Sequence, residues 1–448
     1  MIAPHYQDDS VTLHHGDCID VLRELPERSV DAVVTDPPYG IRFMGKAWDG
    51  ADIEERTARG RETNPMPKGV GGPQGGYRSR AAEAGRYDLS ANAAFGEWCS
   101  AWATECLRIL KPGGHLLAFG GSRTWHRLSS GIEDAGFEIR DSIAWLYGSG
   151  FPKSMDVSKA IDKAAGVGQA KRTGKESGTY GAFTGNNTIT APVTADAKQW
   201  QGWGTALKPA FEPIVVARKP LAGTVAANVL EHGTGALNIN ACRIHTAGSE
   251  ARSYTVKRLK PGAELNRTGG NWRPADGVEY EGTTTDGRWP TNVVLDAHQA
   301  EVLDQQSGLL KSGARTGKRS SSKFGHLYGE FAGTCEAPRE ASQGGASRFF
   351  PVFRYEAKAP TSERPSADGV QHPTVKPLDL MRWLVRLVTP VGAVVLEPFA
   401  GSGTTAEACI LEDRRCIAIE REAEYLPLIV SRLRKPVQQG LFGLGAGA

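Results

Sequence analysis

The sequence predicts an α/β fold in which helices cover both faces of a mostly parallel sheet, and two observations predict it. First, short apolar runs with the character of buried strands recur along the chain, at residues 11–15, 30–35, 115–120, 394–397 and 416–420. Second, stretches with helical periodicity alternate with them, at residues 18–25, 92–110, 380–388, 406–411 and 424–434. Strands that alternate with helices form parallel sheets, because each helix packs back onto the sheet between successive strands.

Turn signals and apolar stripes justify the individual elements in chain order. The first helical stretch ends at Pro26, because proline cannot continue a helix. The second carries a stripe that a core would bury, made of Phe95, Trp98, Trp102, Cys106, Ile109 and Leu110. Lys111-Pro112-Gly113-Gly114 is expected to end it, so that the next strand begins at His115. A last stripe follows Pro377 and contains Leu380, Met381, Leu384, Leu387 and Val388.

Composition limits the class of protein. The chain has 448 residues, 40% of them apolar, and a net charge of +3. No apolar segment approaches the ~18 residues that span a bilayer, and no secretion signal is visible, so we expect a cytoplasmic protein with no membrane partner. Seven cysteines are scattered without a Cys-x-x-Cys pair, which disfavours a metal site and is typical of buried apolar residues.

An acid, two prolines and an aromatic, Asp36-Pro37-Pro38-Tyr39, follow the apolar run at 30–35. Each proline fixes φ and removes a backbone N–H, so the chain leaving the strand is stiff and offers carbonyls without competing donors. The Asp36 carboxylate and the Pro37 carbonyl can accept from one amino group, and the Tyr39 ring can stack on a flat base. A strand that ends in a Pro-Pro turn with a capping Asp explains the four residues equally well, so alone they leave both interpretations open.

A glycine-rich turn, Gly401-Ser402-Gly403-Thr404, lies between the apolar run at 394–397 and a helical stretch. A strand, a Gly-x-Gly turn and a helix N-terminus are typical of a cofactor loop, because glycine lets a ligand approach the backbone. The next apolar run ends on Glu420, where an acid can hold ribose hydroxyls. The turn is neither the full dinucleotide fingerprint nor a P-loop, since no Lys follows Gly403.

Together these two elements resemble the DNA amino-methyltransferases that use S-adenosylmethionine. Asp36-Pro37-Pro38-Tyr39 matches the family's catalytic motif, and the Gly-x-Gly turn preceded by Phe399 matches its cofactor motif. The catalytic motif comes first here, which is the circularly permuted order of the family's β class. The segments 372–377 and Gly16-Asp17-Cys18 resemble the motifs for the methionine end and the adenine of the cofactor. Runs at 143–153 and 207–213 also look like members carried by phages or prophages.

The resemblance implies a Rossmann-like methyltransferase sheet and a set of site residues. The catalytic residues would be Asp36, Pro37, Pro38 and Tyr39, acting on a base flipped out of the duplex. The cofactor would contact Asp17, Cys18, Thr374, Lys376, Glu397, Phe399, Gly401, Ser402, Gly403, Thr404 and Glu420. Glu397 stands where the family often carries Asp, and plain core packing also explains Phe399. Phe211 lies in a region like the family's other base-pocket motif, but a buried aromatic explains it somewhat better.

The resemblance also divides the chain. Residues 1–221 would form the catalytic half of the methyltransferase domain, with flexible insertions at about 50–90 and 153–205, and 372–435 the cofactor-binding half. The α/β alternation disappears over 222–371, which we assign to an inserted target-recognition region, and 436–448 is expected to be a flexible tail. Two basic runs in that region supply candidate DNA contacts at Lys257, Arg258, Lys260, Lys318, Arg319 and Lys323. A solvated surface explains each run alone, but the interleaved aromatics suit phosphate contact with base stacking.

The expected activity is methyl transfer from S-adenosylmethionine to the N6 amine of adenine in double-stranded DNA. Transfer to N4 of cytosine is the main alternative, because Asp in the first motif position favours adenine with exceptions. A methyltransferase for RNA or protein, a catalytically silent binding module and a nicotinamide dehydrogenase are weaker alternatives. A homodimer and a separate restriction endonuclease are partners that the sequence leaves open, and the chain contains no convincing nuclease motif.

Overall fold

The computed structural model describes most of the chain in two compact units. The described residues are 2–41, 90–148, 150, 154–167, 170–173, 188–244, 253–258, 278–283, 287–313, 342–353, 366–367 and 369–434. One unit comprises Met1–Tyr147 and Phe211–Ala448, and the other is Gly148–Ala210. The predicted insertion up to residue 89 and the predicted tail at 436–448 lie outside the described residues.

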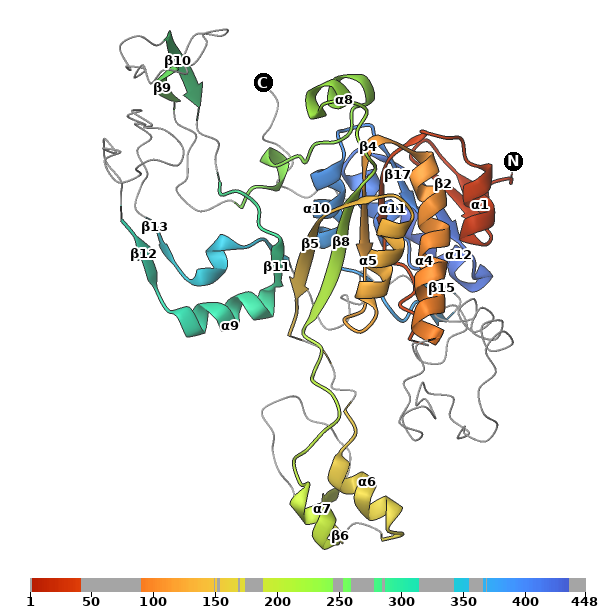
Figure 1. Cartoon of the computed structure of the whole chain (residues 1–448), viewed down its shortest axis with the longest axis vertical. Helices are drawn as coiled ribbons and strands as arrows, with labels where there is room; N and C mark the ends of the chain where they lie inside the picture. The colour runs from red at the N-terminus through yellow and green to blue at the C-terminus, as the bar shows by residue number, and fades with distance from the viewer. Residues whose placement is uncertain are drawn as a thin grey trace, which may run out of the picture. The chain divides into compact units, whose positions relative to one another are not determined.

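The larger unit is built on a ten-stranded sheet with the order β1-β2-β18-β17-β3-β4-β8-β5-β11-β14 (Figure 1). Its strands are β1 (Tyr6–Gln7), β2 (Val11–His15), β3 (Val30–Thr35), β4 (Leu110–Phe119), β5 (Glu138–Leu146), β8 (Phe211–Arg218), β11 (Val293–Asp296), β14 (Val352–Phe353), β17 (Val394–Glu397) and β18 (Arg415–Glu420). The run from β2 to β4 is parallel, as is the run from β5 to β14, whereas β8 is antiparallel to both β4 and β5. The predicted mostly parallel sheet is therefore confirmed.

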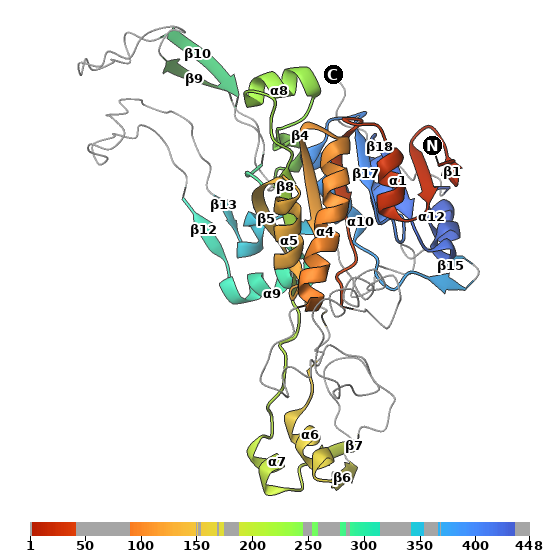
Figure 2. The same cartoon turned by 45° about the vertical axis from the view of Figure 1, so that its right-hand side comes forward.

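Helices cover both faces of this sheet, as Figures 1 and 2 show. Along β3, side chains alternate between two core clusters, with Val33 in one and Val34 in the other. The cluster of Val33 takes in residues of α1 (Cys18–Glu24), α4 (Ser90–Ile109) and α5 (Trp125–Asp134). The cluster of Val34 takes in residues of α10 (Leu378–Val388), α11 (Thr404–Leu411) and α12 (Leu426–Leu433). The apolar stripes predicted in α4 and α10 are buried, so both predicted helices are confirmed.

The predicted turn between α4 and the following strand is a bulge inside β4. Val30 of β3 lies opposite Leu110, but the pairing then shifts and Ala32 lies opposite His115. The extra residues leave the regular ladder near Gly113, whose φ of +77° is a conformation that favours glycine. The regular part of the strand therefore begins at His115, as the sequence predicts.

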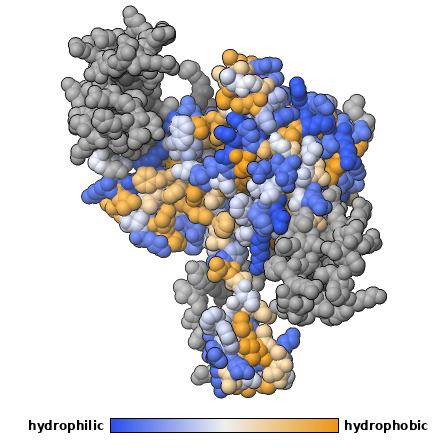
Figure 3. All heavy atoms as spheres, in the orientation of Figure 1, coloured by the Kyte–Doolittle hydropathy of each residue, from blue (hydrophilic) through white to orange (hydrophobic). Residues whose placement is uncertain are grey.

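The region 222–371 contributes strands to the main sheet as well as separate elements. β11 and β14 extend the sheet beside β5. The other elements are α8 (Val225–His232), the short 3-10 helices at Asn240–Cys242 and Ala346–Phe349, α9 (Ala297–Ser307), and the antiparallel pairs β9 (Ser253–Arg258) with β10 (Val278–Thr283), β12 (Leu310–Ser312) with β13 (Ser342–Gly344), and β15 (Ser366–Ala367) with β16 (Val370–Gln371). Figure 3 shows apolar side chains on the surface of α8, among which Leu230 is 89% exposed. The target-recognition role of this region stays a prediction.

The smaller unit contains more regular structure than its composition suggests. Its elements are α6 (Val157–Ala164), α7 (Ala195–Gln199) and the antiparallel strands β6 (Ala170–Thr173) and β7 (Thr188–Ala191). The buried Asp162 of α6 accepts hydrogen bonds from the backbone of Val193 and Thr194 and from the Thr194 hydroxyl. Thr194 in turn caps α7, so the two helices are joined through one carboxylate. No helix in the described part of the chain is long and apolar enough to cross a membrane.

Candidate active site

The two sequence motifs leave the sheet from neighbouring strands. β3 and β17 are parallel, with Ala32 opposite Val395 and Val33 opposite Leu396. Because the carboxyl ends of parallel strands meet at one edge of a sheet, the segment after Thr35 and the turn after Glu397 start side by side. The Thr35 hydroxyl donates to the Glu397 carboxylate and ties the two strand ends together. Two segments that are remote in sequence therefore lie at one edge of the sheet.

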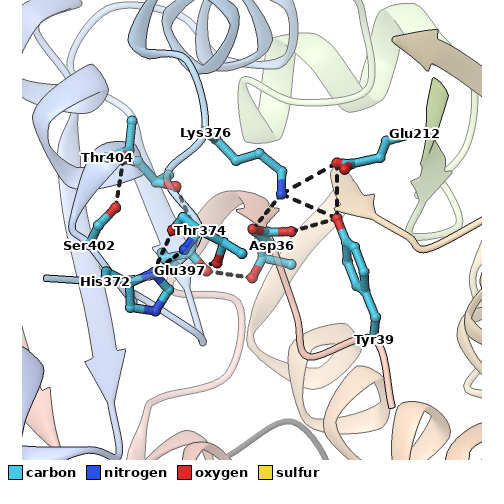
Figure 4. Close-up of polar contacts among 11 residues, drawn as sticks. Asp36, Tyr39, Glu212, His372, Thr374, Lys376, Glu397, Ser402 and Thr404 are labelled. Atoms are coloured by element: carbon cyan, nitrogen blue, oxygen red, sulfur yellow. Dashed lines mark hydrogen bonds and ion pairs between the residues drawn. The ribbon is translucent and has the colours of Figure 1, made fainter. Parts of the chain in front are cut away.

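Four side chains, Asp36, Tyr39, Glu212 and Lys376, form a polar group that we call the carboxylate cluster (Figure 4). The Tyr39 hydroxyl lies 3.0 Å from Asp36 Oδ1 and 3.1 Å from Glu212 Oε2. Lys376 Nζ lies 2.7 Å from Asp36 Oδ2, 3.2 Å from the Tyr39 hydroxyl and 3.4 Å from Glu212 Oε2. The segments that supply these residues are far apart in sequence, and the sheet order brings them together.

The charges in the cluster fix its protonation. Burial by itself lowers the pKa of Lys376, but the negative charges of Asp36 and Glu212 outweigh it and raise the pKa above its ordinary value. Burial, followed by the same two carboxylates, raises the pKa of Tyr39 well above its ordinary value. The cluster therefore contains an ammonium group and a neutral phenol between two carboxylate side chains.

The backbone and ring of Tyr39 are held by the segment after β4. Thr124 Oγ1 donates to the Tyr39 carbonyl at 2.9 Å. A Cβ at Gly121 would lie 3.1 Å from the Tyr39 ring, so glycine leaves the space that the ring occupies. Lys376 Nζ lies 5.4 Å from the centre of the same ring. The Tyr39 ring thus has a fixed place beside Asp36.

The glycine-rich turn needs its glycines. Gly401 and Gly403 have φ values of +53° and +76°, in the left-handed region that side chains disfavour. A Cβ at Gly403 would also lie 3.1 Å from Ile429, so α12 packs directly on the turn. The turn is tight enough to bring its backbone, and the N-terminus of α11, close to a ligand.

A buried arginine supports this turn from α12. Arg432 donates to the carbonyl and hydroxyl oxygens of Ser402 at 3.0 and 3.2 Å, and to Thr404 Oγ1 at 2.8 Å. Its Nε atom forms an ion pair with Glu407 of α11. The side chain is fully buried, so its charge is balanced by Glu407 and by the oxygens of the turn.

Two glutamates lie at the ends of the cofactor strands. Burial raises the pKa of Glu397 to about 8, although hydrogen bonds from Thr35, Thr405 and the Phe399 backbone oppose the shift. Burial likewise raises the pKa of Glu420 to about 7, and its two oxygens accept from the backbone of Gly401 and Glu422 at 2.7 and 2.8 Å. Glu420 therefore connects the end of β18 to the turn after β17.

The remaining predicted cofactor residues lie near the same edge or in contact with it. Asp17 caps α1 by accepting from the Ile19 backbone at 2.9 Å, and Cys18 is buried. They follow β2, the parallel neighbour of β18, and the Gly16 N–H donates to the Glu420 carbonyl. The Thr374 backbone N–H donates to His372 Nδ1 at 3.3 Å, and a Cβ at Gly401 would lie 3.2 Å from His372 Nε2, so this segment borders the glycine-rich turn.

Two aromatic residues differ in their surroundings. Phe399 packs with ring-centre distances of 5.5 Å to Trp98 and 5.6 Å to Trp102, so the core interpretation describes its contacts. Phe211, the first residue of β8, is 40% exposed. The interpretation of Phe211 as a buried aromatic is therefore wrong, because the strand enters the sheet core only at Pro213 and Ile214.

Sequence reasoning missed Glu212 and Arg432. Glu212 lies in the run at 207–213 that carries part of the resemblance, but nothing local indicates that β8 lies beside β4 and faces Lys376. A positive charge at Arg432 inside an otherwise apolar helix face was the available signal. Of the candidate DNA contacts, Lys257 and Arg258 lie in β9 without described side chains, and Lys260, Lys318, Arg319 and Lys323 lie outside the described residues.

Comparison with known proteins identifies the family to which the site belongs. A family model for N6/N4 methyltransferases, described as DNA methylase, matches residues 30–431. This chain belongs to the N6/N4 DNA methylase family. The predicted family is thereby confirmed, and DNA is the substrate of the methylase.

The methylase is also similar to individual proteins. The methylase is 25% identical over 429 residues to the Type II methyltransferase M.HindIII of Haemophilus influenzae, covering 94% of each chain. It is 47% identical over 58 residues to the Type II methyltransferase M2.MboI of Moraxella bovis, covering 13% of this chain and 21% of that protein. Among solved structures, the PvuII DNA methyltransferase, described as cytosine-N4-specific, matches with a TM-score of 0.42 at 14% identity, over 96% of this chain and 88% of that chain.

Proposed function

We propose that this methylase transfers the methyl group of S-adenosylmethionine to the N6 amine of adenine in duplex DNA, with Asp36 as the residue that binds the amine. One observation carries the proposal: the segment with Asp36 and the glycine-rich turn start from adjacent ends of parallel strands. A cofactor on the turn and a base on Asp36 would then share one edge of the sheet.

The residues around the turn suit this cofactor. A carboxylate has about four acceptor positions, and the two Glu420 oxygens accept from the backbone N–H groups of Gly401 and Glu422, so Glu420 can also accept ribose hydroxyls. The resemblance adds Asp17 and Cys18 toward the adenine of the cofactor, and Thr374 and Lys376 toward its methionine end. In the structure the Lys376 ammonium is paired with Asp36 and Glu212. Bound there, S-adenosylmethionine supplies a methyl group that its sulfonium already activates.

The protein then has to orient a poor nucleophile. The amine lone pair is delocalised into the base, and Asp36 with the Pro37 carbonyl would accept its two hydrogens and localise that pair. Orientation of this kind contributes on the order of 7–11 kcal/mol in favourable cases. The amine nitrogen gains the methyl group as the methyl–sulfur bond breaks, and Asp36 receives the proton that the nitrogen loses. Tyr39 would stack on the flipped base, whose extrusion costs a few kcal/mol.

The choice of adenine rests on the first motif position. In the family that the sequence resembles, Asp at this position favours adenine, and this chain has Asp36. Transfer to N4 of cytosine presents the same two-hydrogen amine to the same acceptors, so it is the second candidate.

Tritiated S-adenosylmethionine and duplex DNA carrying many sequence contexts test the proposal. After digestion to nucleosides, we expect label on N6-methyladenine, and none with the Asp36→Ala variant, which is expected to bind the cofactor as the wild type does. Label on N4-methylcytosine would show that the target base is cytosine and not adenine. An Asp36→Ala variant with wild-type activity would contradict the assignment of Asp36.

A further inference from the structure

Glu212 is a second carboxylate beside Asp36 to which the reaction described above gives no task. It is the second residue of β8 and is partly buried, with its side chain 21% exposed. Its Oε2 atom lies 3.1 Å from the Tyr39 hydroxyl and 3.4 Å from Lys376 Nζ. It therefore shares both hydrogen-bond donors with Asp36.

Asp36 already has both oxygens engaged. The Tyr39 hydroxyl is at Oδ1, at 3.0 Å, and Lys376 Nζ is at Oδ2, at 2.7 Å. A carboxylate has about four acceptor positions, so a target amine that donates to Asp36 would share it with these two groups and weaken their hold on it. Lys376 cannot move out of the site uncompensated, because its side chain is 11% exposed and an ammonium that is buried needs an anionic partner.

Glu212 stands where that partner is needed. Figure 4 shows Lys376 and the Tyr39 hydroxyl between the two carboxylates, each joined to both. A small shift of Lys376 toward Glu212 would shorten the 3.4 Å contact and lengthen the 2.7 Å one. Both donors would stay hydrogen-bonded throughout, so Asp36 could be released without leaving an unpaired charge.

Glu212 also decides the charge of the site. Asp36 and Lys376 together are neutral, and the second carboxylate gives the cluster a net negative charge. Positive charge develops on the amine nitrogen as it gains the methyl group, and a negative environment that is already in place favours this change.

We propose that Glu212 is a positioning residue for methyl transfer: it takes over Lys376 and the Tyr39 hydroxyl from Asp36 when the target amine enters. The inference rests on the proposed function. It assigns Glu212 no contact with the base or the cofactor, so its effect is expected in the rate of transfer and not in cofactor affinity.

Two substitutions at Glu212 separate a role of charge from a role of shape. Glu212→Gln keeps the size of the side chain and removes its charge, whereas Glu212→Asp keeps the charge and shortens the reach. We expect Glu212→Gln to lower the single-turnover rate at saturating DNA and cofactor by about tenfold, the effect of one charge-assisted hydrogen bond. Glu212→Asp should be faster than Glu212→Gln. Binding of S-adenosylhomocysteine, measured by calorimetry, should stay within about twofold of wild type.

The outcomes separate the hypotheses. Glu231→Gln, on the exposed surface of α8, is the matched control and should behave as wild type. If Glu212 only fills space, Glu212→Gln will be the faster variant, and a Glu212→Gln rate equal to wild type would also overturn the inference. If the wild-type chain labels no duplex at all, the proposed function fails and the inference fails with it.

A double-mutant cycle tests the link to Lys376. If Glu212 acts by binding the Lys376 ammonium, Glu212→Gln should lower the transfer rate less in a Lys376→Met background, because that variant has no ammonium for Glu212 to bind. Additive penalties in this cycle would contradict the proposed transfer of Lys376. The same samples give melting temperatures, which check that each variant is folded.

Discussion

At the residue scale, the chemistry of the site depends on carboxylates that are close together and differently buried. Asp36 and Glu212 are partly exposed and are bridged by Lys376, whereas Glu397 is 2% exposed and is surrounded by neutral donors. Burial favours the protonated carboxyl and raises the pKa of Glu397. Carboxyl groups that differ in burial and in their neighbours therefore lie at one edge of the sheet.

Glu397 should make stability depend on pH. Its pKa of about 8 in the folded protein lies above its ordinary value of 4.5. The folded state thus keeps a proton that the unfolded state has lost, so the stability of the fold declines as the pH rises from about 4.5 to 8 and is level above that. We expect Glu397→Gln to lose less of its melting temperature than the wild type does between pH 5 and pH 8.

Thermal melts at a series of pH values measure this difference directly. Glu420, with a pKa of about 7, keeps its own contribution in the variant, so the decline should be reduced and not abolished. If the melting temperatures of wild type and Glu397→Gln decline equally with pH, Glu397 is ionised in the folded state at these pH values.

At the element scale, the position of α12 controls the shape of the glycine-rich turn. Arg432 joins α12 to Ser402 and Thr404 in the turn and to Glu407 in α11. Ile429 of the same helix packs against Gly403. The conformation of the turn therefore depends on contacts with α12, a helix that follows it in sequence.

Arg432→Met should weaken cofactor binding. The substitution leaves Glu407 without its partner and frees the oxygens of the turn, and loss of one partner of a buried pair costs about 3–5 kcal/mol. We expect a lower melting temperature and a Kd for S-adenosylhomocysteine that rises about tenfold. In the double variant Arg432→Met/Glu407→Leu, part of the melting temperature should return while the Kd stays high. An unchanged Kd in a folded Arg432→Met protein would remove Arg432 from the cofactor site.

At the scale of the whole molecule, the unit Gly148–Ala210 is an insertion between two paired strands. β5 and β8 are antiparallel, and Leu146 at the end of one lies opposite Phe211 at the start of the other. Two strand ends that face each other need only a short hairpin turn of about two to five residues.

Replacing 148–210 by a short Gly-containing turn should therefore leave the sheet folded. We expect a cooperative melt within a few degrees of wild type and unchanged binding of S-adenosylhomocysteine, since the turn after β17 and Glu420 belong to the larger unit. A control variant with a longer Gly-Ser linker at the same place tests whether strain in the new turn matters. If both variants fail to melt cooperatively, the unit contributes to the stability of the sheet.

Much of the element structure was predictable because its signals are local. The stripe of Trp98, Trp102 and Cys106 marks one face of α4, and the run at 30–35 marks a strand with two buried faces. The bulge in β4 was predicted only as a turn, because its glycines report backbone conformation and not the strand pairing around it. The contribution of β11 to the main sheet was missed, since four residues carry too little pattern to show which neighbour they pair with.

The sequence by itself determined the family, the order of the motifs and the two segments that form the site, because a strand followed by Asp-Pro-Pro-Tyr or by Gly-Ser-Gly-Thr is written in consecutive residues. Only the tertiary structure decided that Lys376 bridges Asp36 and Glu212 and that Arg432 supports the turn. Such contacts join residues that are distant along the chain, and they arise from the order of strands in the sheet, which local periodicity does not encode.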